Sequence, residues 1–405
     1  MLKLDLIHTL AFSGIVLFIG YGLRRLIPPL ARYNLPAPVI GGMLISLIIL
    51  LARSSGIELL KFDTTLQSPL MIAFFTTIGF GASLSLLRVG GPQVMLFFVI
   101  ATICAIAQNV LGALLAVPLG MHPLFGVLTG SVTLTGGPAT GLAFAPLFEE
   151  AGVPAAASVA VAAAMVGIVS GGIIGGPIGT HIIEKYGLSG RKRQVSDTQA
   201  VVKNPIAQGE VEAPAGEDKE SFLLLKGLVV ILVAMWVGSW ISKWFASMDI
   251  TLPAYIGAMI VAAVIRNVDD VTGMLKLSQK SLDDMGSVAL SLFIAMALMT
   301  LKLWEIATLA FPLLVLLVAQ VTLIAVISLW LIHRLMGRDY DAAVMSSGFC
   351  GFMLGTTANS MANMEALTEK YGAAPRAFLV VPMVGAFFLD FTNALIITAC
   401  VNLWR

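Results

Sequence analysis

Long apolar stretches alternate with short polar ones along this chain. A helix needs about 20 apolar residues to cross the hydrocarbon core of a bilayer, and ten stretches approach that length. In the first half they lie at 6–22, 36–52, 69–87, 93–117 and 153–183, and in the second half at 222–244, 252–266, 285–303, 306–331 and 377–403. The pattern predicts an all-α membrane protein with ten transmembrane helices.

Two further apolar stretches, 123–148 and 342–367, are interrupted by Gly, Pro, Thr and Asn residues. Each lies between the fourth and fifth predicted spans of its half. Irregular backbone at membrane depth is tolerated only where it is buried in protein or lines a cavity. We therefore predict that both stretches form re-entrant helical hairpins.

The two halves of the chain repeat one another. The segment LPAPVIG that begins at Leu35 returns as LPAYIG from Leu252. Matching segments divide the chain into two repeats, 1–185 and 222–405, joined by a polar linker at 186–221. Because each repeat has an odd number of spans, the second must cross the membrane in the opposite sense to the first. Such inverted five-helix repeats are typical of secondary transporters.

The distribution of basic residues gives the orientation. With the N-terminus placed outside, eighteen of the 24 Lys and Arg residues fall on the cytoplasmic side. The six that fall outside are Lys3, Arg53, Lys61, Lys243, Lys302 and Arg405. This bias follows the positive-inside rule and predicts both termini outside and a cytoplasmic linker. The hairpins would then enter from opposite sides and meet around one site.

Composition narrows the class of protein. Hydrophobic residues make up 58% of the chain and charged residues only 12%, whereas soluble domains have about a quarter of their residues charged. The net charge of +1 indicates no nucleic-acid partner. No nucleotide-binding loop, metal-ligand cluster or nucleophile–base pair occurs in the sequence. We expect an ion-driven carrier and no enzyme activity. A passive channel is the alternative, because re-entrant hairpins also build pores.

The first hairpin contains the sequence TGGPATG at 135–141. Glycine lets the backbone turn sharply and approach a ligand closely, and Pro138 interrupts the helix. Free N–H groups at a helix N-terminus suit a carboxylate, whereas unwound carbonyls suit Na⁺. Close packing of small residues between membrane helices is the alternative explanation.

In the second hairpin, Asn359 and Asn363 are four residues apart and share one helix face. An amide donates to a carboxylate and offers its oxygen to a cation. Both residues are therefore candidates for the substrate site. A structural hydrogen bond is the alternative role.

Five polar residues lie inside predicted spans and are candidate Na⁺ ligands. Asp390 is the one carboxylate well inside a span, where an ionisable residue is a functional candidate by default. It could bind Na⁺, hold a substrate ammonium or take a proton, with Asn393 or Thr392 as its partner. Gln108, Asn109 and Gln320 lie in the fourth span of each half, where they would line the pathway or hydrogen-bond across helices.

Nearly the whole chain resembles the glutamate:sodium symporter family of bacterial inner membranes. The stretches that carry the resemblance are PLMIAFFTTIGF at 69–80, GSVTLTGG at 130–137, SLFIAMALMTLKLWE at 291–305, CGFMLG at 350–355 and FLVVPMVGAFFLDFTNALII at 378–397. The resemblance implies Na⁺-coupled uptake of L-glutamate, or of a related anionic amino acid, by a homodimer. It also implies an elevator mechanism, in which a transport domain bearing both hairpins moves against a fixed scaffold.

The resemblance also implies which residues bind substrate. By position, the hairpin-tip residues of the family correspond to Thr133, Thr135, Gly136, Gly137, Thr140 and Gly141 in the first hairpin, and to Gly351, Gly355, Thr356, Thr357, Asn359 and Asn363 in the second. Asp390 stands where the family also has Asp.

The chain departs from the family pattern at both hairpins. Pro138 and Ala139 follow the Gly-Gly pair, where glutamate-carrying members typically have His, and Phe349 also replaces a His. A carrier for another carboxylate is therefore one alternative. A proton-coupled carrier, with Asp390 as the proton site, is another.

Overall fold

The computed structural model describes residues 2–56, 59–188, 218–248, 250–306 and 309–404, and almost all regular structure in them is helical. A helix or a pair of helices occupies each of the ten stretches expected to span the membrane. Of the expected linker at 186–221, residues 189–217 lie outside the described part of the chain.

The first half begins with a short strand, β1, and its longest helix is α9. Its elements are β1 (Leu2–Lys3), α1 (Leu6–Leu26), α2 (Pro28–Arg32), α3 (Ala37–Ser54), β2 (Leu60–Lys61), α4 (Gln67–Gly81), α5 (Leu84–Val89), α6 (Gly91–Ala116), the 3₁₀ turn η1 (Val117–Leu119), α7 (Pro123–Val127), the π turn η2 (Leu128–Val132), α8 (Gly137–Glu150) and α9 (Ala156–Tyr186).

The elements of the described part of the second half are all helical. Its elements are α10 (Lys219–Ala246), α11 (Ala254–Thr272), α12 (Gln279–Met299), the 3₁₀ turn η3 (Leu303–Glu305), α13 (Ala310–Ile327), the π turn η5 (Ser328–Ile332), α14 (His333–Leu335), α15 (Tyr340–Leu354), α16 (Thr357–Tyr371), α17 (Pro375–Val384), the π turn η6 (Gly385–Leu389) and α18 (Asp390–Trp404).

Within the described residues, seven helical segments are long enough and apolar enough to cross a bilayer. They are α1, α3, α6 with η1, α9, α10, α12, and α13 continued through η5 and α14. The other expected spans coincide with α4 and α5, with α11, and with α17 and α18, which η6 joins. The chain is therefore a multi-pass, all-α membrane protein, while ten spans remain the prediction from the sequence.

The chain divides into two compact units, and each takes segments from both halves. The first comprises Met1–Ser83 and Gln208–Leu309, and the second comprises Leu84–Ala207 and Ala310–Arg405. Both hairpin regions, α7 to α8 and α15 to α16, belong to the second unit.

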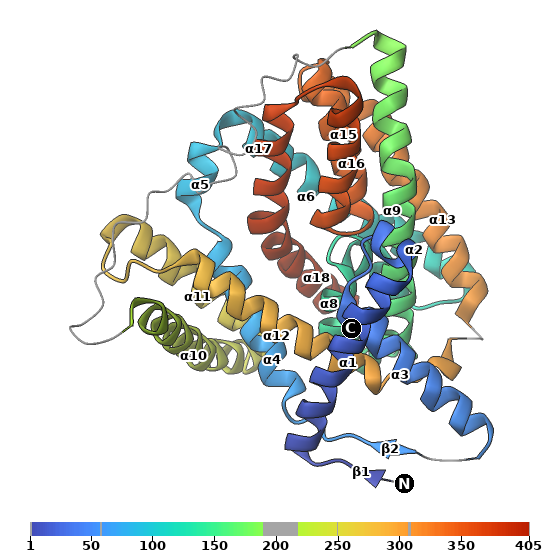
Figure 1. The fold of residues 1–405 in the computed structure, drawn as a ribbon, viewed down its shortest axis with the longest axis vertical. Helices are drawn as coiled ribbons and strands as arrows, with labels where there is room; N and C mark the ends of the chain where they lie inside the picture. Colours follow the sequence, from blue (N-terminus) through green and yellow to red (C-terminus); the bar gives the residue numbers. More distant parts are fainter. Residues whose placement is uncertain (1, 57–58, 189–217, 249, 307–308, 405) are drawn as a thin grey trace. The chain divides into compact units, whose positions relative to one another are not determined.

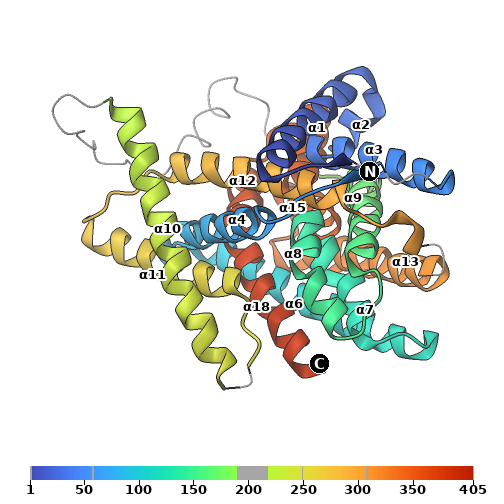
Figure 2. The same ribbon diagram turned by 90° about the horizontal axis from the view of Figure 1, so that it is seen from below.

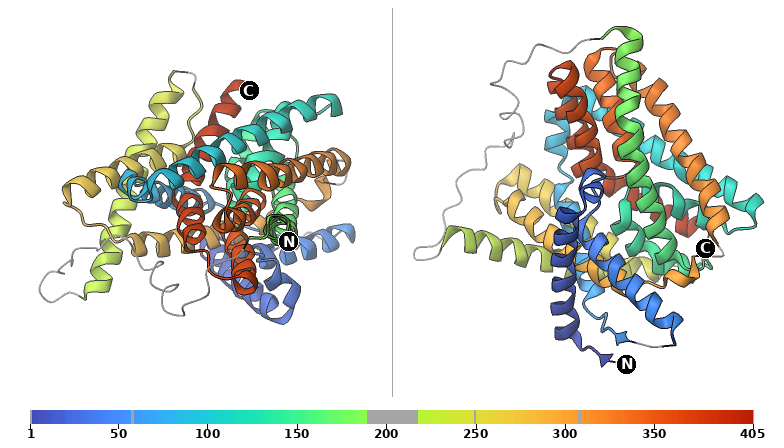
Figure 3. Two further views of the ribbon diagram at one scale, coloured as in Figure 1. Left: turned by 90° about the horizontal axis from the view of Figure 1, so that it is seen from above. Right: turned by 45° about the vertical axis from the view of Figure 1, so that its right-hand side comes forward.

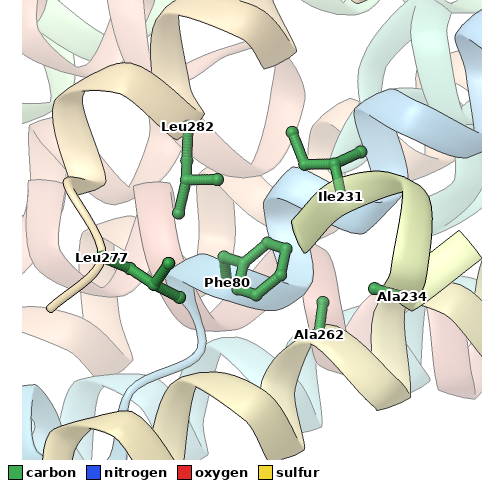
Figure 4. Close-up of a cluster of buried hydrophobic side chains, with 6 residues drawn as sticks. All are labelled: Phe80, Ile231, Ala234, Ala262, Leu277 and Leu282. Atoms are coloured by element: carbon green, nitrogen blue, oxygen red, sulfur yellow. The ribbon is translucent and has the colours of Figure 1, made fainter. Parts of the chain in front are cut away.

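In the first unit, α10 packs against α11, and both contact α4 (Figure 2). Phe80 of α4 lies in the middle of a buried cluster, with Ile231 of α10, Ala262 of α11 and Leu282 of α12 around it (Figure 4). Burial of these apolar side chains holds the four helices together.

In the second unit, α9 is the element on which the hairpins are built. The helices α8, α15 and α16 all pack against it. Figure 1 labels α15 and α16 beside α9, and the right-hand view of Figure 3 shows the same neighbours. Asp339 defines where α15 begins, because its carboxylate accepts a hydrogen bond of 2.9 Å from the backbone N–H of Ala342.

Candidate functional site at the two hairpin breaks

Each hairpin region consists of two helices separated by a break. In the first, Gly130 has non-helical backbone angles (φ −96°, ψ −128°) within η2, and α8 begins at Gly137 after a turn at Thr135 and Gly136. In the second, α15 ends before Gly355 and α16 begins at Thr357. The hydroxyl of Thr356 caps α16 by accepting a hydrogen bond of 3.3 Å from the N–H of Asn359.

The two breaks meet each other. A Cβ atom placed on Gly137, whose φ is +70°, would lie 3.9 Å from the carbonyl oxygen of Gly355. The N-termini of α8 and α16 therefore converge. Gly136, Thr356 and Thr357 are partly exposed at this point, although the residues on either side of the breaks are largely buried. Converging helix N-termini offer free N–H groups and positive dipole ends to an anion.

The threonines of the first hairpin have different environments. The hydroxyl of Thr133 donates to the carbonyl of Leu128 at 2.8 Å, and that of Thr135 donates to Oε1 of Gln108 at 2.8 Å. The hydroxyl of Thr140 makes no hydrogen bond with any described residue. Of the three, Thr140 is the one whose hydroxyl is available to a ligand.

The asparagines of the second hairpin attach it to α9. The amide nitrogen of Asn359 donates to the carbonyl of Ile168 at 2.7 Å, and that of Asn363 donates to the carbonyl of Gly171 at 3.0 Å. These hydrogen bonds match the structural role that was predicted from the sequence as the alternative for both residues. The Oδ1 atom of Asn359 is nevertheless buried without a partner among the described residues.

A row of glycines makes the attachment possible. Gly167, Gly171, Gly175 and Gly179 recur every four residues and lie on one face of α9. A Cβ atom on Gly175 would collide with the amide of Asn363, and one on Gly179 would collide with the side chain of Leu367. The remaining two glycines face α15 in the same way: a Cβ on either would meet Leu354.

The glycines assigned to the site are packing residues as well. A Cβ atom on Gly141 would lie 2.8 Å from Cβ of Ala160 on α9, and one on Gly351 would lie 2.6 Å from the amide nitrogen of Asn363. The absence of side chains at these positions lets the hairpin helices approach their neighbours.

Gln108 on α6 contacts both hairpins. Its Oε1 accepts from Thr135, its amide nitrogen donates to the carbonyl of Met353 at 3.2 Å, and its backbone carbonyl accepts from the amide of Gln320 at 2.7 Å. The Gln108 side chain is fully buried. It therefore joins the first break to the end of α15.

The next residue on α6, Asn109, supports the first break itself. Its Oδ1 accepts a hydrogen bond of 3.0 Å from the backbone N–H of Ser131. The carbonyl of Ser131 in turn accepts a hydrogen bond of 3.0 Å from the amide of Asn393 on α18. Ser131 was not among the residues assigned from the sequence, although a Ser next to Gly130 in an apolar stretch was a signal that could have found it.

Asp390 lies apart from these contacts. It is the first residue of α18, and its side chain is half-buried. Its carboxylate makes no hydrogen bond or ion pair with the described part of the chain. The expected pairing of Asp390 with Asn393 is therefore not seen. The amide of Asn393 instead donates to Ser131.

The chain was compared with known proteins, and it matches one family over most of its length. A family model described as sodium/glutamate symporter matches residues 2–373. The chain is 40% identical over 400 residues to the "Sodium/glutamate symporter" of Escherichia coli (strain K12), covering 98% of this chain and 97% of the relative. The protein of the same name from Haemophilus influenzae is 37% identical over 390 residues, covering 96% and 95% of the two chains.

Proposed function

Because the chain belongs to the sodium/glutamate symporter family, we propose that it binds L-glutamate between its two hairpin breaks. It is a membrane transporter that moves glutamate together with Na⁺, the co-transported coupling ion. The observation that carries the proposed location is the contact between the breaks at Gly137 and Gly355, where the N-termini of α8 and α16 converge.

Glutamate carries two carboxylates, and two helix N-termini are well suited to hold them. The proposed substrate site consists of the breaks and the first turns of α8 and α16. Its residues are Thr133, Thr135, Gly136, Gly137, Thr140, Gly141, Gly351, Gly355, Thr356, Thr357, Asn359 and Asn363. Within this set, the hydroxyls of Thr140 and Thr357 are the candidates for direct contact, because neither is hydrogen-bonded to another described residue.

The polar residues behind the breaks form the proposed Na⁺ region. Gln108, Asn109, Gln320 and Asn393 all belong to the hydrogen-bonded groups around Gln108 and Ser131. Asp390, one helical turn before Asn393 on α18, is proposed to supply negative charge near the ion. Neutral oxygens and unwound backbone are the groups with which transporters commonly bind Na⁺.

An elevator mechanism fits the division into two units. The second unit contains both hairpins and is the proposed moving domain, and the first is the proposed scaffold and the homodimer contact. The helix order also supports two repeats, since α1, α3, α4, α6, the first hairpin and α9 are followed in the second half by α10, α11, α12, α13, the second hairpin and the pair α17 and α18. Binding of both ligands would favour the closed state that crosses the membrane.

Contacts within each unit support the proposed orientation in the bacterial inner membrane, with both termini outside and the linker in the cytoplasm. The guanidinium of Arg53 lies 4.1 Å from the ring centre of Trp304, and both are predicted outside. The hydroxyl of Tyr371 donates to Glu184 at 2.8 Å, and both are predicted inside. Residues predicted on the same side therefore meet in each unit.

The proposed function is tested by uptake of radiolabelled L-glutamate into proteoliposomes that contain the purified protein. We expect concentrative uptake with an inward Na⁺ gradient and none when choline replaces Na⁺. Equilibration without accumulation would instead indicate a channel. Uptake driven by a proton gradient in the absence of Na⁺ would contradict sodium coupling.

A further inference from the structure

Around the first break, some side-chain oxygens accept a hydrogen bond from the protein and others do not. Oδ1 of Asn109 accepts from the N–H of Ser131, and Oε1 of Gln108 accepts from Thr135. Both α6 amides are thus engaged in holding the first hairpin. Oδ1 of Asn109 and Oε1 of Gln108 are therefore less available to a cation than oxygens that accept no hydrogen bond.

Besides Oε1 of Gln320, two oxygens in the same group have no donor. Oγ of Ser131 and Oδ1 of Asn393 make no hydrogen bond within the described part of the chain, and both side chains are 0% exposed. The two residues touch, because the amide nitrogen of Asn393 donates to the carbonyl of Ser131 at 3.0 Å. A buried acceptor without a donor costs free energy, so two such acceptors on hydrogen-bonded neighbours suggest an electropositive ligand at this position.

The chemistry of these groups favours a monovalent cation. Both oxygens are neutral, and the nearest carboxylate on α18, that of Asp390, begins the helix one turn earlier. Protein sites for divalent cations such as Ca²⁺ and Mg²⁺ usually include carboxylate ligands. A broken helix with unwound backbone, as at Gly130, is typical of Na⁺ sites in transporters.

We propose that Na⁺ is bound at the Gly130 break by Oγ of Ser131 and Oδ1 of Asn393. The inference rests on the proposed function, because it takes Na⁺ as the coupling ion. It assigns Gln108 and Asn109 as positioning residues and leaves Asp390 outside the coordination shell. The bound ion would lie beside the bonds that run from Ser131 through α6 to Met353, and thus next to the link between the two hairpins.

The test compares Ser131→Ala with wild type in two measurements. The first is the rise in melting temperature of the detergent-purified protein as NaCl replaces choline chloride, without glutamate. The second is the Na⁺ concentration for half-maximal glutamate uptake. In Ser131→Ala we expect the Na⁺-induced stabilisation to be lost and the half-maximal Na⁺ concentration to rise about tenfold, which corresponds to about 1.4 kcal/mol of binding free energy.

Ser346→Ala is the matched control. Ser346 is also a fully buried serine of the second unit, but its hydroxyl donates to the carbonyl of Ala342 within its own helix at 2.9 Å. This variant should respond to Na⁺ as wild type does. An unchanged Na⁺ response in folded Ser131→Ala would overturn the proposed site.

Asn393→Asp decides the question if Ser131→Ala does not fold. It keeps Oδ1 and adds negative charge, although it replaces the amide nitrogen that donates to the carbonyl of Ser131 with an oxygen. The added charge should outweigh this loss, so Na⁺ should bind more tightly and the half-maximal concentration should fall. A purely structural role for Asn393 predicts the opposite, and an unchanged or higher value would reject the site. Absence of Na⁺-dependent uptake in wild type would reject the proposed function itself, which is a different result.

Discussion

At the scale of single residues, the side-chain amide of Gln108 joins the two hairpins, because it bonds to Thr135 of the first and to Met353 of the second. Replacing Gln108 with Leu removes the acceptor of Thr135 and the donor to Met353. The buried hydroxyl of Thr135 then keeps only its 4.0 Å contact with the sulfur of Met353, a weak acceptor, and losing the stronger bond costs about 1–3 kcal/mol. We expect a lower melting temperature and a glutamate KM raised about tenfold, measured by thermal unfolding and uptake kinetics.

Thr102→Val on the same helix provides the control. Among the described residues, Thr102 donates only to the carbonyl of Phe98 within α6, at 2.9 Å. Its removal should leave the glutamate KM at the wild-type value. A Gln108→Leu variant with wild-type KM and stability would show that the link between the hairpins has no role.

The sequence identified Gln108, Asn359 and Asn363 as polar residues in apolar helices, and each proves to be buried and hydrogen-bonded. It could not identify their partners. The carbonyls that Asn359 and Asn363 contact lie on α9, 191 and 192 residues earlier in the chain. The sequence marks Ser131 only as a Ser next to Gly130, and its contact with Asn393 comes from the fold.

At the scale of elements, the glycine face of α9 is where substitution should do most harm. A Cβ atom on Gly175 would collide with the amide of Asn363 and disturb its bond to Gly171. We expect Gly175→Ala to lower stability by about 1–3 kcal/mol, as overpacking of a tight interface does, and to reduce uptake. Thermal unfolding in detergent measures the first effect.

The neighbouring residue is the comparison for this prediction. A Cβ atom on Gly176 would have no described atom within 4 Å. Gly176→Ala should therefore be neutral or stabilise α9 by up to about 1 kcal/mol, because Ala is the better helix former. Equal losses in both variants would contradict the role of the contact with α16, because helix propensity alone favours Ala at both positions.

The positions of the helices were predictable, because apolar length and Gly-rich breaks are properties of local sequence. The stretches 123–148 and 342–367 differ by only a few residues from the bounds of α7 to α8 and of α15 to α16. The grouping of helices into units was not predictable in this way. It depends on packing between distant segments, such as Phe80 against Ile231 in the first unit.

At the scale of the whole molecule, the orientation in the membrane makes a direct prediction. In a variant without Cys104, Cys350 and Cys400, a single cysteine is introduced at exposed Ser54 or at exposed Thr272. A membrane-impermeant maleimide should label the first in intact cells and the second only after permeabilisation. The reverse pattern would invert the proposed topology, and labelling of both from outside would contradict the spans between them.

In the π turns the number of residues sets the rotation of the helix that follows. Among the described residues, η2, η5 and η6 all belong to the second unit. A π turn closes its hydrogen bond over one residue more than an α turn, and one residue corresponds to about 100° of rotation in a helix of 3.6 residues per turn. Deleting one residue from η6 would therefore rotate α18 and carry Asn393 away from Ser131 without changing either side chain. A deletion of one residue in these segments therefore changes which residues every following turn of the helix presents on a given face.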